Sequence, residues 1–182
     1  MLATERLRLC PLQQQDFEVC YRDILGNPRV MTWMKTGRAL SEEEAREQFS
    51  HWVTHGAAYP YWGIALKTTG MLVGYCGLRQ LDDTAAIELT YAIAPSHWGQ
   101  GIVPEAAAAV LVYGFEQLGC DRIWARTGLT HQASQAVMVK LGMKLTGDRP
   151  PDFARDVARN VAPNTPDVVF YTLSRQEFIS LR

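Results

Sequence analysis

The sequence lacks several features that would place it among nucleic-acid-binding or membrane proteins. Its 182 residues include 18 Lys and Arg against 19 Asp and Glu, which gives a formal net charge of -1. No overall positive field therefore favours nucleic acid as a partner. No apolar run reaches the roughly 18 residues that a membrane helix needs, and the first residues show no apolar signal-peptide core. We expect neither nucleic acid nor membrane as a partner.

Cysteine is scarce, and the histidines form no metal motif. The four cysteines lack C-x-x-C spacing and predict neither a zinc site nor a redox motif; they are Cys10, Cys20, Cys76 and Cys120. We expect them to be buried thiols in a reducing cytoplasm. His51 and His55 have the i, i+4 spacing that can bind zinc, but no third ligand stands out, so we expect surface histidines and no metal.

The chain does contain a glycine turn between an apolar run and an alanine-rich helix. Residues 85–94 predict a strand, and a helix is predicted from Val103 to about Leu118. Gly99 and Gly101 let the backbone approach a ligand closely. The unpaired N–H groups of the first helical turn and the helix dipole then favour an anion. We therefore expect this turn to bind a phosphate-bearing cofactor.

Two well-known phosphate-binding loops fit the turn poorly. A nucleoside-triphosphate loop needs Gly-Lys-Ser/Thr, and this triplet does not occur in the sequence. A dinucleotide-binding turn needs a third glycine, whose place is taken by Pro104, and an acidic residue at the end of the next strand. Asp121 precedes the next predicted strand instead of ending it.

A third possibility comes from resemblance to a known family. The stretch Trp98–Ala106, Trp-Gly-Gln-Gly-Ile-Val-Pro-Glu-Ala, resembles the pyrophosphate loop of the GCN5-related N-acetyltransferases. It is most similar to the branch that acetylates the N-termini of ribosomal proteins. Similar motifs follow the same order along the chain, in Thr4–Phe17, His131–Met143 and Val168–Phe178. The ordered set is more specific than the glycine turn alone.

Apolar patterning predicts a single α/β domain over residues 1–182. The predicted strands are Arg6–Leu9, Tyr61–Lys67, Leu72–Arg79, Ala86–Ile93, Arg122–Thr127, Met143–Thr146 and Val168–Leu173. The predicted helices are Gln13–Tyr21, Ser41 to about Thr54, Val103–Leu118 and Gln132–Leu141. Asn27–Leu40 and Gly147–Asp167 are expected to be loops.

The resemblance adds detail to that fold and names the cofactor. It implies three α/β/α layers around a mixed, mostly antiparallel sheet of about seven strands, two of which separate to admit the pantetheine arm of acetyl-coenzyme A (acetyl-CoA). The residues expected to bind acetyl-CoA are Tyr91, Ile93, Trp98, Gly99, Gln100, Gly101, Ile102, Val103, His131 and Ser134. The chain departs from the family pattern at Trp98 and Val103, and His131 stands in place of asparagine.

Two residues are expected to handle protons. Glu88 is a lone carboxylate in an apolar strand and could accept the proton of an amine before that amine attacks a thioester. The alternative is a structural carboxylate paired with a cation such as Arg79. By resemblance, Ser134 lies beside the sulfur of coenzyme A, where it or a bound water could protonate the thiolate. The alternative is a serine that bonds to the helix backbone.

The remaining candidates concern the reacting carbonyl and the acceptor. Backbone N–H groups between Tyr91 and Ile93 are implied to stabilise charge on the thioester oxygen. Met138 occupies the position at which many relatives carry a tyrosine acid. Trp33 and Tyr61 belong to an aromatic-rich set that is implied to line the acceptor pocket, whereas the alternative is ordinary core packing.

These features predict an acetyl-CoA-dependent N-acetyltransferase. The acetyl group would move to a primary amine by direct attack in a ternary complex, and the acceptor would be a protein N-terminus or a small amine. The alternative is a module that holds coenzyme A without catalysis, which the departures at Val103, His131 and Met138 favour. A homodimer is possible, and a cytoplasmic location is expected.

Overall fold

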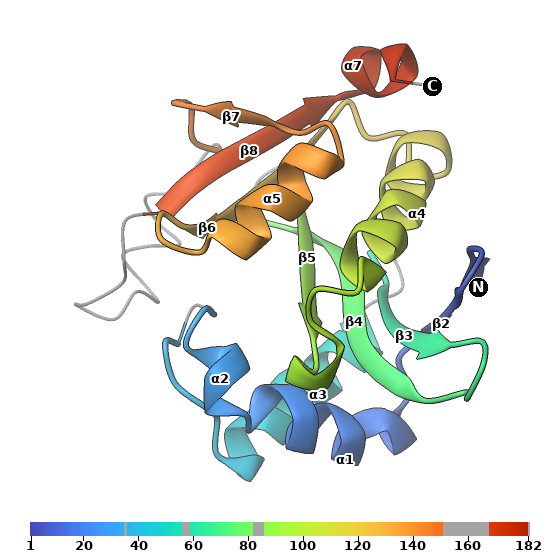
Figure 1. Cartoon of the computed structure of the whole chain (residues 1–182), viewed down its shortest axis with the longest axis vertical. Helices are drawn as coiled ribbons and strands as arrows, with labels where there is room; N and C mark the ends of the chain where they lie inside the picture. The colour runs from blue at the N-terminus through green and yellow to red at the C-terminus, as the bar shows by residue number, and fades with distance from the viewer. Residues whose placement is uncertain (35, 56–58, 82–85, 151–167, 182) are drawn as a thin grey trace.

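A twisted eight-stranded sheet forms the centre of the protein, and helices cover both of its faces (Figure 1). The computed structural model describes residues 1–34, 36–55, 59–81, 86–150 and 168–181. The strands are β1 (Leu2–Ala3), β2 (Leu7–Pro11), β3 (Tyr61–Leu66), β4 (Leu72–Gln80), β5 (Ile87–Ile93), β6 (Arg122–Gly128), β7 (Lys144–Thr146) and β8 (Val168–Ser174). The α-helices are α1 (Phe17–Cys20), α2 (Pro28–Met31), α3 (Glu42–His55), α4 (Ile102–Glu116), α5 (Gln132–Lys140) and α7 (Arg175–Ser180).

The strands follow the order β1-β2-β3-β4-β5-β6-β8-β7 across the sheet. Every neighbouring pair is antiparallel except β5 and β6, which are parallel. The prediction of a mixed, mostly antiparallel sheet is confirmed. The sheet has eight strands where about seven were predicted. The additional strand is β1, whose two residues are too few to produce an alternating pattern.

The helices differ from the prediction at three places. The segment Asn27–Leu40 is not entirely loop, because Pro28 starts the short helix α2 and the Asn27 side chain caps it. The predicted helix Gln13–Tyr21 is divided into short helical pieces that continue to Leu25. Helix α7 was not predicted at all, although Ser174 and Glu177 form a capping box at its start. Each is a short element with little apolar periodicity.

Alternation along β5 directs its side chains to two different layers. Ile87, Leu89 and Ile93 belong to the core cluster beneath helix α4. Ala92 belongs to the second cluster, beneath helices α1 to α3. The side chains of β5 therefore point to the two layers in alternation, as is usual for a strand. Helix α4 approaches the sheet closely at Gly114, where an added Cβ would lie 2.7 Å from the Ile123 side chain.

Strands β5 and β6 separate soon after they begin. They pair only at Ile87 with Ile123 and at Glu88 with Trp124, although each strand is seven residues long. Beyond Glu88 the two strands no longer bond to one another, and the sheet opens in the direction of the glycine turn. This is the separation that the family resemblance implied.

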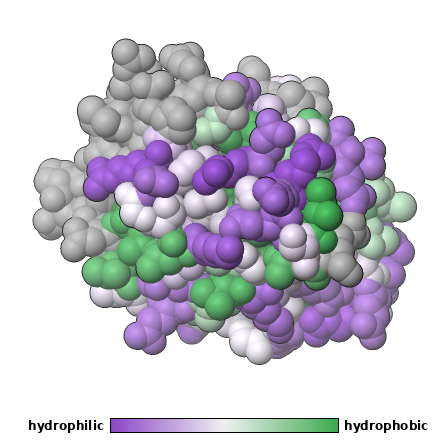
Figure 2. Space-filling model, turned by 90° about the horizontal axis from the view of Figure 1, so that it is seen from above, coloured by the Kyte–Doolittle hydropathy of each residue, from purple (hydrophilic) through white to green (hydrophobic). Residues whose placement is uncertain are grey.

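At the end of the molecule that carries β7 and α7, the exposed apolar side chains of the described residues do not form one continuous face. Exposed apolar residues there include Leu145, Ile179 and Leu181, and Figure 2 shows apolar atoms in separate patches among polar ones.

Within the described residues no helix is long and apolar enough to cross a membrane. The expectation of buried cysteines is confirmed for Cys20 and Cys76. It is wrong for Cys10, which is exposed, and Cys120 is only partly buried. Most of the predicted loop Gly147–Asp167 lies outside the described residues.

Candidate active site

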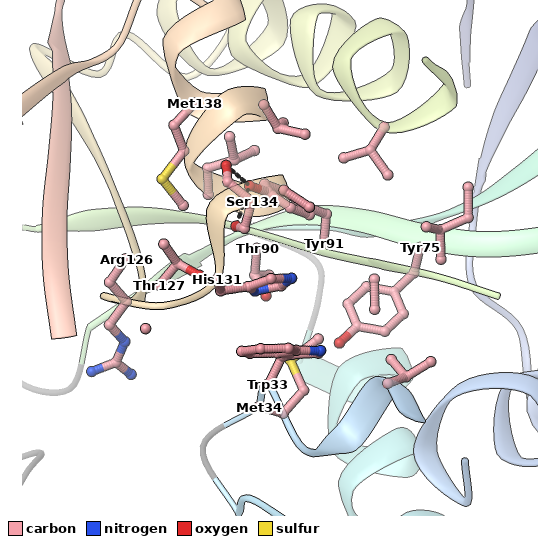
Figure 3. A pocket seen from close by; sticks show the side chains of 18 of the residues that line it. Trp33, Met34, Tyr75, Thr90, Tyr91, Arg126, Thr127, His131, Ser134 and Met138 are labelled. Carbon is pink, nitrogen blue, oxygen red and sulfur yellow. Dashed lines mark hydrogen bonds between the residues drawn. The ribbon is translucent and has the colours of Figure 1, made fainter. Parts of the chain in front are cut away.

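A cavity of about 1350 Å³ occupies the opening between β5 and β6 and continues towards α2 and α3. All of the predicted site residues line it except Gln100. Gln100 lines a smaller adjoining hollow, and its side-chain amide donates to the Ser96 carbonyl oxygen at 3.0 Å. Figure 3 shows Ser134 and Met138 of α5 above the opening and Trp33 and Met34 below it. Residues from distant parts of the chain therefore meet in one cavity.

The glycine turn at one end of the cavity has the geometry that an anion site requires. Gly99 and Gly101 have φ angles of 73° and 71°, which favour glycine over any residue with a side chain. A Cβ at Gly99 would meet nothing within 4 Å, so the backbone here is open to a ligand. Gly101 precedes α4 directly, and the first N–H groups of that helix have no intrahelical acceptor. The residues present fit a pyrophosphate.

The residues between β1 and β2 hold this turn in place. The Glu105 carboxylate accepts from Thr4 Oγ1 at 2.5 Å and from Arg6 Nε at 2.6 Å, while Arg6 Nη1 donates to the Gln100 carbonyl oxygen at 3.0 Å. Partial burial would raise the pKa of Glu105, but these hydrogen bonds from Thr4 and Arg6 lower it overall. The carboxylate therefore stays charged and fixes the start of α4.

Trp98 connects the turn to the end of β5. Its indole Nε1 donates to the Ile93 carbonyl oxygen at 3.0 Å, and the Arg29 guanidinium lies 5.2 Å from its ring centroid. The Trp98 ring thus holds the glycine turn against the end of β5, beside the predicted phosphate site.

Tyr91 and Ser134 meet in the middle of the cavity. The Tyr91 hydroxyl lies 2.9 Å from Ser134 Oγ, and either oxygen can donate. Burial raises the pKa of Tyr91, with a smaller opposing effect from the Ser134 hydrogen bond, so the phenol stays protonated. Sequence reasoning assigned Tyr91 only to the cofactor and did not identify its hydroxyl as the partner of Ser134. Met138 is buried against the same core.

His131 and Trp33 join the two sides of the cavity. Their rings stack with centroids 4.2 Å apart and an interplanar angle of 13° (Figure 3). His131 Nδ1 also lies 3.2 Å from Thr127 Oγ1. Burial lowers the pKa of His131, which favours the neutral imidazole. A segment near α2 thus reaches the residue that precedes α5.

Glu88 is buried, with 4% of its surface exposed, and it forms ion pairs with two arginines. Arg79 Nε donates to Oε2 at 2.5 Å, and Arg126 Nε lies 2.9 Å from Oε1. All three residues lie on one face of the sheet, because Arg79 is opposite Glu88 in β4 and Arg126 is two residues beyond its neighbour in β6. The pairing with Arg79 that the structural alternative predicts is present, and Arg126 is a partner that the sequence alone did not indicate.

An aromatic wall adjoins these charges. The rings of Tyr61 and Trp52 stack at 4.7 Å, and Tyr75 lies 4.7 Å from Trp52. Burial raises the pKa of Tyr61 to about 12, and the charges of Arg79 and Glu88 also affect that pKa, in opposite directions. Trp52 and Tyr75 also belong to the core cluster, so this wall serves both the core and the cavity.

Two kinds of residue were missed from the sequence. Arg126 could have been noticed as a charged residue within the predicted strand Arg122–Thr127, at a position where an inward-facing charge requires a partner. Tyr75 gave no signal beyond ordinary core composition. In the described part of the chain no three potential ligands from His, Cys, Asp and Glu gather into a metal site.

Comparisons with known proteins agree with this geometry. Residues 6–144 match the model of the acetyltransferase (GNAT) domain family. The uncharacterised N-acetyltransferase YoaA of Bacillus subtilis is 30% identical over 153 residues, which cover 81% of this chain and 84% of that protein.

Two solved structures show how widely the fold extends. The spermidine N-acetyltransferase of Vibrio cholerae, in complex with coenzyme A and spermine, has a TM-score of 0.77 at 18% identity and covers 97% of this chain and 99% of its own. The ribosomal L7/L12 α-N-protein acetyltransferase RimL, in complex with coenzyme A, has a TM-score of 0.76 at 16% identity over 94% of this chain and 95% of its own. The similarity of the whole fold agrees with the family match, and the chain belongs to the GNAT acetyltransferase family.

Proposed function

We propose that the protein transfers the acetyl group of acetyl-CoA to a primary amine, by direct attack within a ternary complex. One observation carries the proposal: the glycine turn, the Tyr91–Ser134 pair and the buried Glu88 all line the same cavity. An anion site, a hydroxyl pair and a carboxylate in this order are what acyl transfer to an amine requires. Among the described lining residues none is a cysteine, which supports direct attack over a covalent route.

The cofactor would extend from the glycine turn into the opening between β5 and β6. The N–H groups from Gly99 to Val103 would bind the pyrophosphate. Tyr91, Ile93, His131 and Ser134 would follow along the cavity. The distance along β5 from Ile93 to Glu88 spans five residues, or about 17 Å at ~3.3 Å per residue. The acceptor would then bind at the Glu88 end, beside Trp33 and Tyr61.

Protons would be handled at both ends of the reacting group. Glu88, directly or through water, would accept the proton of the attacking amine. Ser134 would donate to the departing sulfur while its oxygen accepts from the Tyr91 hydroxyl. Because burial keeps Tyr91 protonated, it serves as a donor rather than as a base.

The alternative function is a domain that holds coenzyme A without catalysis. One observation favours it: both Glu88 oxygens already lie in ion pairs with arginines, which gives that carboxylate a structural role without any part in catalysis. The two functions differ in turnover and agree in cofactor binding.

Calorimetric titration with acetyl-CoA, followed by thiol release with a panel of primary amines, tests the proposal. We expect binding by the wild-type protein and release of coenzyme A in the presence of an acceptor. Binding without turnover on any amine would favour the holding domain. Failure to bind acetyl-CoA would overturn both functions.

The acceptor and the setting are less specific. The structures named above act on spermidine and on a ribosomal protein, so both a small amine and a protein N-terminus are compatible with this fold. All four cysteines are unbonded thiols, which supports a reducing, cytoplasmic location. A homodimer and a single domain over residues 1–182 also belong to the proposal.

A further inference from the structure

The Tyr75 hydroxyl is a buried polar group to which the described residues offer no hydrogen bond. Only 3% of Tyr75 is exposed, and burial raises its pKa well above the usual range, so the phenol stays protonated. The buried hydroxyl of Tyr91, in contrast, lies within hydrogen-bond distance of Ser134. A buried hydroxyl without a partner destabilises a fold, whereas phenylalanine would fill the same space without that penalty. Core packing alone therefore does not explain a tyrosine at this position.

Tyr75 lines the cavity on the side of the sheet that helices α1 to α3 cover. Figure 3 shows its hydroxyl directed into the space beside Trp33 and Met34. The Trp52 and Tyr61 rings contact its ring, with centroids 4.7 Å and 5.9 Å away. Because these neighbours fix the phenol, the partner of its hydroxyl has to come from the cavity. That partner would be water in the free protein and a bound molecule in a complex.

The walls around this hydroxyl are aromatic or uncharged. Trp33 stacks on His131 and still has 41% of its surface exposed. From α2 to α3 the chain contributes only uncharged side chains to the described lining, among them Met31, Met34, Gln48 and Trp52. Aromatic and apolar walls with a few fixed polar groups favour a ring-sized apolar body. A polycation would lose its hydration there without gaining a counter-charge from these helices.

The sheet register places the hydroxyl and the candidate base at the two ends of this space. Tyr75 is opposite Ala92 in β5, and Ala92 lies four positions beyond Glu88 on the same strand. The two positions are therefore separated by about 13 Å along the strand. This separation leaves room for one ring with a short amine-bearing arm and a hydrogen bond at each end.

We propose that the acceptor is a primary amine with an uncharged, ring-bearing body that carries an oxygen, and that the Tyr75 hydroxyl binds this oxygen. Tyr75 is then a specificity-determining residue. The inference rests on the proposed acetyl transfer and specifies its substrate class. The transfer is unchanged: the amine nitrogen bonds to the acetyl carbon as the thioester bond breaks, the amine proton passes to Glu88, and coenzyme A leaves as a thiol protonated by Ser134.

Matched amines test this recognition directly. Tyramine has a hydroxylated ring and a short amine-bearing arm, O-methyltyramine keeps the oxygen as an acceptor, and phenethylamine lacks it. Spermidine and a short peptide with a free N-terminus represent the other acceptor classes. Thiol release from acetyl-CoA gives kcat and KM, and mass spectrometry identifies the acetylated amine. We expect kcat/KM for tyramine to exceed that for phenethylamine by about tenfold, because a site that binds an oxygen discriminates against the analogue without it.

The Tyr75→Phe variant separates recognition from packing. We expect kcat/KM for tyramine to fall by about tenfold, mainly through KM, while phenethylamine changes less than about twofold. A hydroxyl with a purely structural role would affect both amines equally. Tyr113→Phe, which removes a hydroxyl from α4 in the other core cluster, is the matched control and should keep the preference.

The Trp33→Ala variant tests the aromatic wall independently of the hydroxyl. We expect KM to rise by about three- to tenfold for tyramine and for phenethylamine alike, and less than about twofold for butylamine, which has no ring. Equal losses for all three amines would contradict a ring-binding wall. Thermal unfolding and acetyl-CoA titration of each variant, compared with the wild type, exclude folding defects and loss of the cofactor.

The outcomes distinguish this inference from the proposed function. Equal turnover of tyramine and phenethylamine, or better turnover of spermidine or the peptide, would overturn the inference and leave the acetyltransferase intact. Acetyl-CoA binding without turnover of any amine would overturn both.

Discussion

The two ends of the cavity are built in different ways. At the cofactor end, a single stretch of sequence from Ile93 to Glu105 supplies the strand end, the glycine turn and the helix start. At the acceptor end, Arg79, Glu88 and Arg126 come from three separate strands and meet only because those strands are neighbours in the sheet. The first end is local in sequence, and the second depends on strand register.

This difference determines how each end should respond to substitution. A local turn depends on backbone conformation, so changes at its glycines should abolish binding without affecting the far end. A site assembled from three strands depends on charge and register, so changes there should alter the chosen acceptor and the rate while cofactor binding persists. The five predictions below use this contrast, beginning with the largest expected effect.

The Gly101→Glu variant should abolish detectable acetyl-CoA binding. Its carboxylate would repel a pyrophosphate, and its left-handed conformation costs about 1–2 kcal/mol for a residue other than glycine. Gly70→Glu is a matched control, because Gly70 has a φ angle of 72° and lies in open space in the β3–β4 turn. Calorimetry should show normal binding for the control. Equal loss in both variants would indicate a stability effect and not a phosphate site.

The Glu88→Gln variant should lower kcat by about a hundredfold, since positioned bases contribute factors of this order. Acetyl-CoA binding should remain within about twofold by calorimetry, because Glu88 lies at the other end of β5. Glu42→Gln, which affects an exposed pair with Arg46, is the control. An unchanged kcat would leave Glu88 as a structural carboxylate paired with Arg79 and Arg126.

The Tyr91→Phe variant should lower kcat by about five- to tenfold, equivalent to the loss of one hydrogen bond of ~1 kcal/mol. Ser134→Ala should have a similar effect, and the double variant should lose little more, because the two hydroxyls act as a pair. Tyr113→Phe, in α4 against Trp62, is a control for removal of a tyrosine hydroxyl. Fully additive losses would show that the two residues act separately.

The Arg6→Gln variant should raise KM for acetyl-CoA by about three- to tenfold with little change in kcat. Arg6 donates hydrogen bonds to both Glu105 and the Gln100 carbonyl oxygen. Its loss should therefore loosen the glycine turn without displacing the groups that react. The KM for the acceptor amine should not change. A change in that KM would show that the two ends are coupled through the sheet.

The His131→Asn variant should produce the smallest effect, in the pH dependence of stability. Burial lowers the pKa of His131 from 6.5, so the unfolded chain binds a proton that the folded protein excludes. Stability should therefore decline as the pH falls below about 6.5. Asparagine cannot titrate and should remove this part of the decline, as measured by urea unfolding between pH 5 and about 8. An equal decline in the wild type and in the variant would contradict this assignment.

The sequence predicted the cofactor end more completely than the acceptor end, because the residues of the cofactor end are close together in the sequence. Glycine at positive φ, an apolar strand and a helix start all leave signals within a few residues of one another. The alternation of side chains along β5 places Glu88 and Tyr91 on opposite faces. Glu88 and Arg126 are 38 positions apart in the sequence, and Tyr91 and Ser134 are 43 positions apart. In each pair the contacting side-chain atoms lie 2.9 Å from one another. Such contacts need the parallel register of β5 with β6 and the packing of α5, which no local pattern encodes.

The short strand β5 also has a consequence for insertions and deletions. Its seven residues carry Glu88 towards α1–α3 and Tyr91 towards α4 and α5. Because side chains alternate along a strand, a shift of one residue would exchange these faces completely. Glu88 would then point at the apolar layer under α4, and the Tyr91 hydroxyl would leave Ser134. Length variation in this chain should therefore be tolerated in the turns before and after β5 and excluded from the strand itself.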